Sequence, residues 1–133
     1  MKKITLYFLL LLLTTSCHKR LINELQNKNY VKLNDSKVTL VMINANGCGY
    51  SNWAKKDILP AAQKDSFPVY LVTSELDSVI IDSNVVHIGG KLLKSYNYKL
   101  FPQFLLVEPN GKFTRLSGWN KERKEEIFKA MSW

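Results

Sequence analysis

The most informative part of the chain reads VMINANGCGYS, from Val41 to Ser51. It begins in a β-branched and apolar run that is typical of a buried central strand. The cluster at residues 44–47 is typical of a turn, and residues 50–63 then favour a helix. The sequence therefore predicts a strand, a short loop and a helix, with Cys48 where the helix begins.

The remainder of the chain alternates between strand and helix patterns. Apolar runs predict strands at residues 38–43, 69–73, 85–88, 104–107 and 112–116. Further helices are predicted at residues 91–96 and 121–131, whereas residues 74–84 show no clear pattern. The residues of the first helix expected to face the core are Trp53, Ala54, Ile58 and Ala62.

The end of the chain carries a hairpin signal. Asn110-Gly111 lies between two apolar runs, which is the strongest short-range sign of two antiparallel strands. Parallel pairing is expected earlier, where helices separate the strands. The order predicts an α/β fold, with one mixed sheet and helices on both of its faces.

Two motifs make the chain resemble the thioredoxin superfamily. The Val41–Ser51 stretch is similar to the strand, loop and Cys-x-x-Cys helix start of that family, with Cys48 at the nucleophilic cysteine. Residues 96–107 place Pro102 at the family's cis-proline, and a hairpin follows. The resemblance spans residues 38–133. It implies a thioredoxin-like fold, with a central mixed β-sheet flanked by helices on both faces.

The chain departs from the family pattern in ways that affect the chemistry. Ser51 stands where the family has its second, resolving cysteine, and Met42 stands where classical members bury a carboxylate. The resemblance therefore implies a monothiol Cys-x-x-Ser site. The catalytic positions that it implies are Cys48, Ser51 and Pro102. In the family, the backbone before the cis-proline binds extended substrate, a role that the resemblance gives to Phe101.

The position of Cys48 gives a physical reason for reactivity. A cysteine in the first helical turn lies beside unpaired N–H groups and the positive end of the helix dipole, which lower its pKa. The Ser51 hydroxyl is expected to donate to the thiolate, and Lys55 and Lys56 are expected to add positive charge. Without a second thiol, a mixed disulfide is resolved only by an external thiol or a substrate cysteine.

The N-terminus has the pattern of an export signal at residues 1–16. Lys2 and Lys3 precede an apolar run at residues 4–13, which is about half the roughly 20 residues that a membrane-spanning helix needs. The small residues before Cys17 resemble a bacterial lipoprotein signal, in which that cysteine carries the lipid. The expected location is the periplasmic side of a bacterial membrane, with a lipid anchor on Cys17.

Residues 17–37 are expected to form either a tether or a short helix, because Leu21, Ile22 and Leu25 have helical spacing. The thioredoxin-like domain is expected to follow at residues 38–133. With Cys17 lipidated, Cys48 is the one thiol available for exchange. The expected partners are cysteine-containing exported proteins or an external thiol reductant, together with the membrane.

Composition and motif content limit the other functions. The 133 residues leave room for one small domain, and the formal charge of +8 suits solvation or membrane proximity. Nucleic acid is not expected, because there is no aromatic-basic cluster. No metal site is expected, since zinc sites need about four suitable ligands, and no cofactor is expected. Nothing in the sequence brings His87 to Cys48.

Two functions of different classes remain open at this stage. The first is monothiol thiol–disulfide exchange or isomerase-like activity through Cys48. The second is a binding module that keeps the fold and the peptide groove without the chemistry, with Cys48 an inert remnant. A thiol peroxidase is a third and weaker hypothesis, based on the Cys-Gly-x-Ser motif at Cys48.

Overall fold

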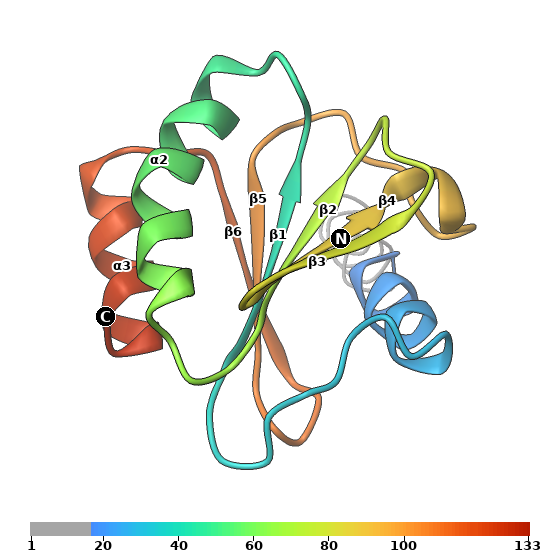
Figure 1. Ribbon diagram of the computed structural model, residues 1–133, viewed down its shortest axis with the longest axis horizontal. Coiled ribbons are helices and arrows are strands. Elements are labelled where there is room, and N and C mark those ends of the chain that lie inside the picture. The colour runs from blue at the N-terminus through green and yellow to red at the C-terminus, as the bar shows by residue number, and fades with distance from the viewer. Residues whose placement is uncertain (1–16) are drawn as a thin grey trace, which may run out of the picture.

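A six-stranded sheet runs through the middle of the molecule (Figure 1). The computed structural model describes residues 17–133, so the signal expected at residues 1–16 lies outside the described residues. The strands are β1 (Thr39–Asn44), β2 (Val69–Thr73), β3 (Val79–Asp82), β4 (Val85–Gly89), β5 (Gln103–Val107) and β6 (Phe113–Ser117). Their order across the sheet is β3-β4-β2-β1-β5-β6.

The pairing of these strands confirms the mixed sheet. β1 pairs in parallel with β2, and β2 with β4. The pairs β1–β5, β5–β6 and β3–β4 are antiparallel. The crossover through α2 makes β1 and β2 parallel, and the β3–β4 and β5–β6 hairpins are antiparallel. β2 and β4 are parallel without a helix between them, because β3 lies between them in the chain.

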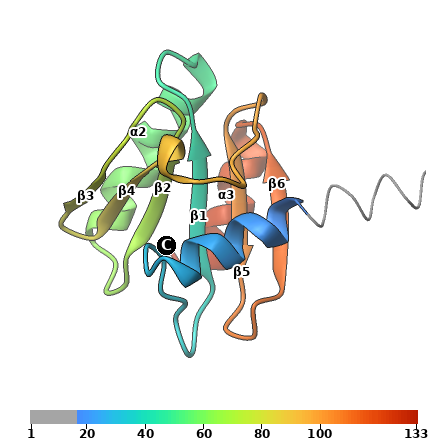
Figure 2. The same cartoon turned by 90° about the vertical axis from the view of Figure 1, so that its right-hand side faces the viewer.

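Helices cover both faces of the sheet. α2 (Gly49–Gln63) and α3 (Lys121–Met131) lie together on one face (Figure 1). The helix at residues 17–27, called the N-terminal helix below, lies across the other face (Figure 2). Among the described residues, no helix is long and apolar enough to cross a membrane.

Alternation along β1 explains why both faces are apolar. Leu40 and Met42 pack toward α2 and α3, whereas Val41 and Ile43 point to the opposite face. The buried residues on the α2 and α3 side include Ala54, Ile58, Phe104, Trp119 and Ile127. Those on the other side include Leu21, Ile22, Leu25, Tyr70, Ile88 and Leu105. The hydrophobic core therefore includes residues that precede Val38, the expected start of the domain.

The prediction of a helix at residues 91–96 is wrong. Only Gly90–Leu92 forms a short 3-10 turn, and Leu93 is already extended. The backbone N–H groups of Lys94 and Ser95 donate to the carboxylate of Glu24 instead of to helical carbonyls. A distant side chain therefore takes the place of local helical hydrogen bonds.

Two further differences concern exposure and an extra strand. Trp53, expected to face the core, is 50% exposed, because Ser51, Ala54 and Ile58 occupy the buried stripe of α2. The sequence also left residues 74–84 unassigned, and the structure places β3 there. Residues 79–81 are β-branched and apolar, which favours a strand, but the run is short and all four residues of β3 are exposed.

Candidate active site around Cys48

Cys48 is the N-cap residue of α2. Its backbone is extended, with φ −79° and ψ 120°, and helical geometry begins at Gly49. The preceding Gly47 has a φ of +78°, a left-handed conformation that favours glycine. The Cys48 thiol is half-buried and free.

The first turn of α2 lowers the pKa of the Cys48 thiol. The largest cause is the backbone N–H of Ser51, followed by the Ser51 hydroxyl, with the N–H of Tyr50 adding to them against the opposing effect of burial. The Cys48 side chain makes no capping hydrogen bond, so these groups act by favouring the charged thiolate beside the start of the helix. Lys55 and Lys56 are not among the causes, so the expected contribution of their charge is not seen.

Ser51 lies one turn into α2 and is fully buried. Its hydroxyl makes no hydrogen bond of ordinary geometry with any described residue. The interaction with Cys48 that lowers the thiol pKa is therefore long or poorly aligned while the sulfur carries its proton. A thiolate, which accepts hydrogen bonds more strongly, gives this unpaired hydroxyl a partner.

Phe101 and Pro102 lie beside the thiol. The Phe101–Pro102 peptide bond is cis, and the Cys48 thiol donates to the Phe101 carbonyl oxygen at 3.7 Å. Pro102 is buried, and its own carbonyl accepts from the backbone N–H of Gly118 at 2.9 Å. The structure therefore brings together Cys48, Ser51, Phe101 and Pro102, which the sequence selected from two distant segments.

Polar residues at the end of β1 were missed by sequence reasoning. Asn44 is buried, and its Nδ2 donates to the Thr73 hydroxyl at 3.4 Å. The backbone N–H of Asn46 donates to Glu75 at 3.2 Å, which ties the loop before Cys48 to the end of β2. The signal in the sequence that could have indicated this polar site is the asparagine, Asn44, at the end of an otherwise apolar strand.

The residues around the site supply no carboxylate or imidazole in place of the family's buried acid. Met42 is fully buried among the apolar side chains beneath α2. His87 lies in β4, which β2 separates from β1. No group of three His, Cys, Asp or Glu residues within residues 17–133 is placed to hold a metal ion.

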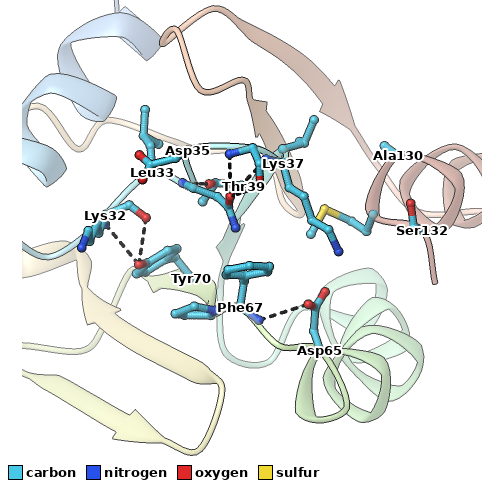
Figure 3. A pocket seen from close by; sticks show the side chains of 15 residues that line it. Lys32, Leu33, Asp35, Lys37, Thr39, Asp65, Phe67, Tyr70, Ala130 and Ser132 are labelled. Atoms are coloured by element: carbon cyan, nitrogen blue, oxygen red, sulfur yellow. Dashed lines mark hydrogen bonds between the residues drawn. The ribbon is translucent and has the colours of Figure 1, made fainter.

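A pocket of about 580 Å³ lies at the opposite end of the sheet from Cys48 (Figure 3). It is bordered by the loop at residues 32–37 and by Phe67, Tyr70 and Met131. The Tyr70 hydroxyl and the Lys32 backbone bond to each other across one side of it. Because it includes neither Cys48 nor Phe101, this pocket is separate from the thiol site.

Comparison with solved structures supports the fold. The crystal structure of the pneumococcal exposed lipoprotein thioredoxin Etrx1 from Streptococcus pneumoniae matches 74% of this chain and 85% of its own, with a TM-score of 0.54 and 19% sequence identity. The solution structure of a candidate thioredoxin from Neisseria meningitidis matches 72% of this chain and 75% of its own, with a TM-score of 0.52 and 17% identity.

These similarities show that the fold is thioredoxin-like. At such identities the likeness concerns the arrangement of strands and helices and not the chemistry of the site. No family model matches the chain, and no curated protein matches it. The function is therefore argued from the residues around Cys48.

Proposed function

We propose that this protein is a monothiol thiol–disulfide exchange protein with Cys48 as its nucleophile. The observation that carries the proposal is the place of Cys48 at the N-cap of α2, where backbone N–H groups lower the thiol pKa. A lower pKa raises the thiolate fraction near neutral pH, and the thiolate is the nucleophile in disulfide exchange.

The first step of the exchange uses only the Cys48 thiol of this chain. The Cys48 thiolate attacks one sulfur of a substrate disulfide, so a new S–S bond forms while the substrate S–S bond breaks. The released substrate thiolate takes a proton from water. Because Ser51 cannot attack the mixed disulfide, an external thiol or a second substrate cysteine completes the exchange and frees Cys48.

Substrate binding is assigned to the backbone before Pro102. The Phe101 carbonyl lies against the Cys48 sulfur, so a peptide paired with this backbone would bring its own cysteine to the thiol. The half-buried Phe101 side chain packs against the core below. We therefore infer an extended, cysteine-containing segment of an exported protein as the substrate.

The anchoring part of the proposal concerns Cys17. Cys17 is exposed at the first described residue of the N-terminal helix, where a lipid on its sulfur would meet no obstruction. The similar pneumococcal protein is itself described as an exposed lipoprotein. We propose a lipid anchor at this cysteine and a location on the outer side of a bacterial membrane.

Trapping of a mixed disulfide tests the exchange function. The full chain is treated with oxidised glutathione, and mass spectrometry of peptides reads the adducts on Cys48 and Cys17 separately. We expect a stable adduct on Cys48 that Ser51→Cys makes short-lived, because a resolving thiol then lies one turn away. Cys48→Ser is the control and should carry no adduct on that peptide.

The alternative is a binding module without thiol chemistry. The replacement of a buried acid by Met42 is the observation that favours it, since the site has no internal proton donor. Under this alternative, Cys48 would alkylate no faster in the folded chain than in a denatured control between about pH 6 and 9. That result would replace the exchange proposal.

A further inference from the structure

The segment that leads to Phe101 has almost no hydrogen bonds within the backbone. In the part of the chain that the structure describes, residues 94–101 take part in no backbone-to-backbone hydrogen bond. Near its end, the Gln103 side chain donates to the Leu100 carbonyl at 3.0 Å, and Cys48 donates to Phe101. Side chains from elsewhere in the fold therefore determine where this segment lies.

The N-terminal helix supplies the most contacts of this kind. Glu24 Oε2 accepts from the backbone N–H of Lys94 at 2.8 Å, and Oε1 accepts from the backbone N–H of Ser95 at 2.8 Å. The Ser95 hydroxyl also donates to Oε1. Hydrogen bonds to a charged carboxylate are roughly twice as strong as neutral ones. Glu24 thus fixes the start of the segment.

Two more side chains of the helix region contact the same segment. Lys28 Nζ lies 3.0 Å from Glu24 Oε2 and donates to the Leu92 carbonyl at 2.8 Å. The buried His18 hydrogen-bonds through Nδ1 to the Tyr98 hydroxyl at 2.9 Å, with the two rings stacked at 5.5 Å. These contacts span residues 92–98, just before Phe101.

The ionisation of Glu24 agrees with this geometry. Burial alone would raise the pKa of Glu24, but the hydrogen bonds from Ser95, Lys94 and Lys28 lower it to about 2. The carboxylate therefore stays charged across the ordinary pH range, and its bonds to the segment persist.

We propose that His18, Glu24 and Lys28, named here the latch, are positioning residues that hold the Phe101 carbonyl against the Cys48 sulfur and so restrain the thiol. The inference rests on the proposed function, because it assigns a control of the same site. A carbonyl that accepts from the thiol favours the protonated form. Releasing the latch should therefore raise the thiolate fraction, while the backbone that would pair with substrate becomes less ordered.

Glu24→Gln in the full chain tests the latch, because the amide nitrogen that replaces one carboxylate oxygen cannot accept, so one of the two N–H groups of Lys94 and Ser95 loses its acceptor. Glu125→Gln on α3 is the matched control, since Glu125 is exposed. Hydrogen exchange reports the amides of residues 92–101. Alkylation with iodoacetamide across pH, read on the Cys48 peptide, reports the thiol.

In Glu24→Gln we expect amide exchange to rise about tenfold at whichever of Lys94 and Ser95 loses its acceptor. The midpoint of Cys48 alkylation should move to lower pH, with a rate about threefold higher near pH 7. Glu125→Gln should leave both unchanged. Faster exchange with an unchanged alkylation profile would overturn the proposal, and so would unchanged exchange.

Ser95→Ala provides a milder variant in case Glu24→Gln does not fold. It removes only the hydroxyl bond to Glu24 and should shift the alkylation profile in the same direction by a smaller amount. A folded Ser95→Ala chain without any shift would also count against the latch. If the alkylation profile shifts as expected but wild-type Cys48 forms no mixed disulfide, the latch stands and the exchange function fails.

Discussion

The two faces of the sheet are covered in different ways, and the candidate site draws on both. On one face, α2 and α3 each follow a strand through a short connection, and α2 brings Cys48 with its lowered pKa. On the other face lie the N-terminal helix and the segment that carries Phe101. The comparison shows that the groups that lower the thiol pKa are neighbours in sequence, whereas the segment before Phe101 is hydrogen-bonded by side chains far away in the sequence.

The largest effect is expected in the core beneath α2 and α3. Phe104 is fully buried there and lies against Trp119, with ring centroids 5.7 Å apart. Phe104→Ala should lower the free energy of unfolding by about 4 kcal/mol, because it removes apolar contacts and leaves a cavity. Urea denaturation would measure the loss. A decrease below about 1 kcal/mol would mean that this face is not the main core.

A somewhat smaller effect is expected on the opposite face. Leu25 of the N-terminal helix is fully buried against the sheet. Leu25→Ala should cost about 3 kcal/mol and keep unfolding a single transition, because the helix is part of the same core. The exposed Asn23 of the same helix gives the control Asn23→Ala. Two separate transitions, or no loss, would show that the helix is an independent appendage.

Acid below about pH 4.5 should weaken the contacts of the N-terminal helix with the segment before Phe101. The folded pKa of Glu24 is about 2 and its ordinary value 4.5, so the stability that it contributes is present above pH 4.5 and is lost as pH falls toward 2. After solvent screening we expect a loss on the order of 1 kcal/mol. The difference in unfolding free energy between wild type and Glu24→Gln should therefore shrink across this range. A constant difference would contradict the assignment.

The smallest effect is expected for the ion pair between α2 and α3. Lys124 Nζ lies 3.5 Å from Asp57 Oδ1, with the two side chains 42% and 30% exposed. Exposed pairs of this kind contribute little, so Asp57→Asn should change the unfolding free energy by less than about 0.5 kcal/mol. Thermal denaturation at low and high salt would measure it. A larger change would mean that surface charge holds this face together.

The sequence predicted the parts of the fold that depend on local pattern. β2 and α3 have the expected bounds, β1 is shifted by one residue at both ends, and α2 begins one residue earlier than expected. Each of these elements has a clear apolar period or a continuous apolar run. β3 was not predicted, because its β-branched run covers only residues 79–81, which is shorter than the run of about four or more residues that marks a strand. The segment after Gly90 was misread as helix because its hydrogen bonds go to Glu24, which lies far away in the sequence.

The candidate site shows the same difference between features that local sequence determines and features that distant contacts determine. Cys48, Ser51 and Pro102 were found from their motifs, and the first-turn N–H groups account for the thiol pKa as local chemistry predicts. The contribution of His18 and Glu24 could not be found, because nothing in their own neighbourhood indicates the segment that they contact. The helical spacing of Leu21, Ile22 and Leu25 indicated a helix or a tether, but burial against the sheet depends on the whole fold.

The position of Cys17 has a consequence for motion. The sulfur is exposed, yet the next residue, His18, is buried against Tyr98. A group attached to the Cys17 sulfur is therefore connected to the folded domain through the Cys17 side chain alone, with no flexible segment of backbone between them. A spin label there would report the tumbling of the whole domain. If the attached group is a lipid, the distance between Cys48 and the bilayer surface would be nearly constant. Only substrate cysteines at about that distance from the membrane would then reach Cys48.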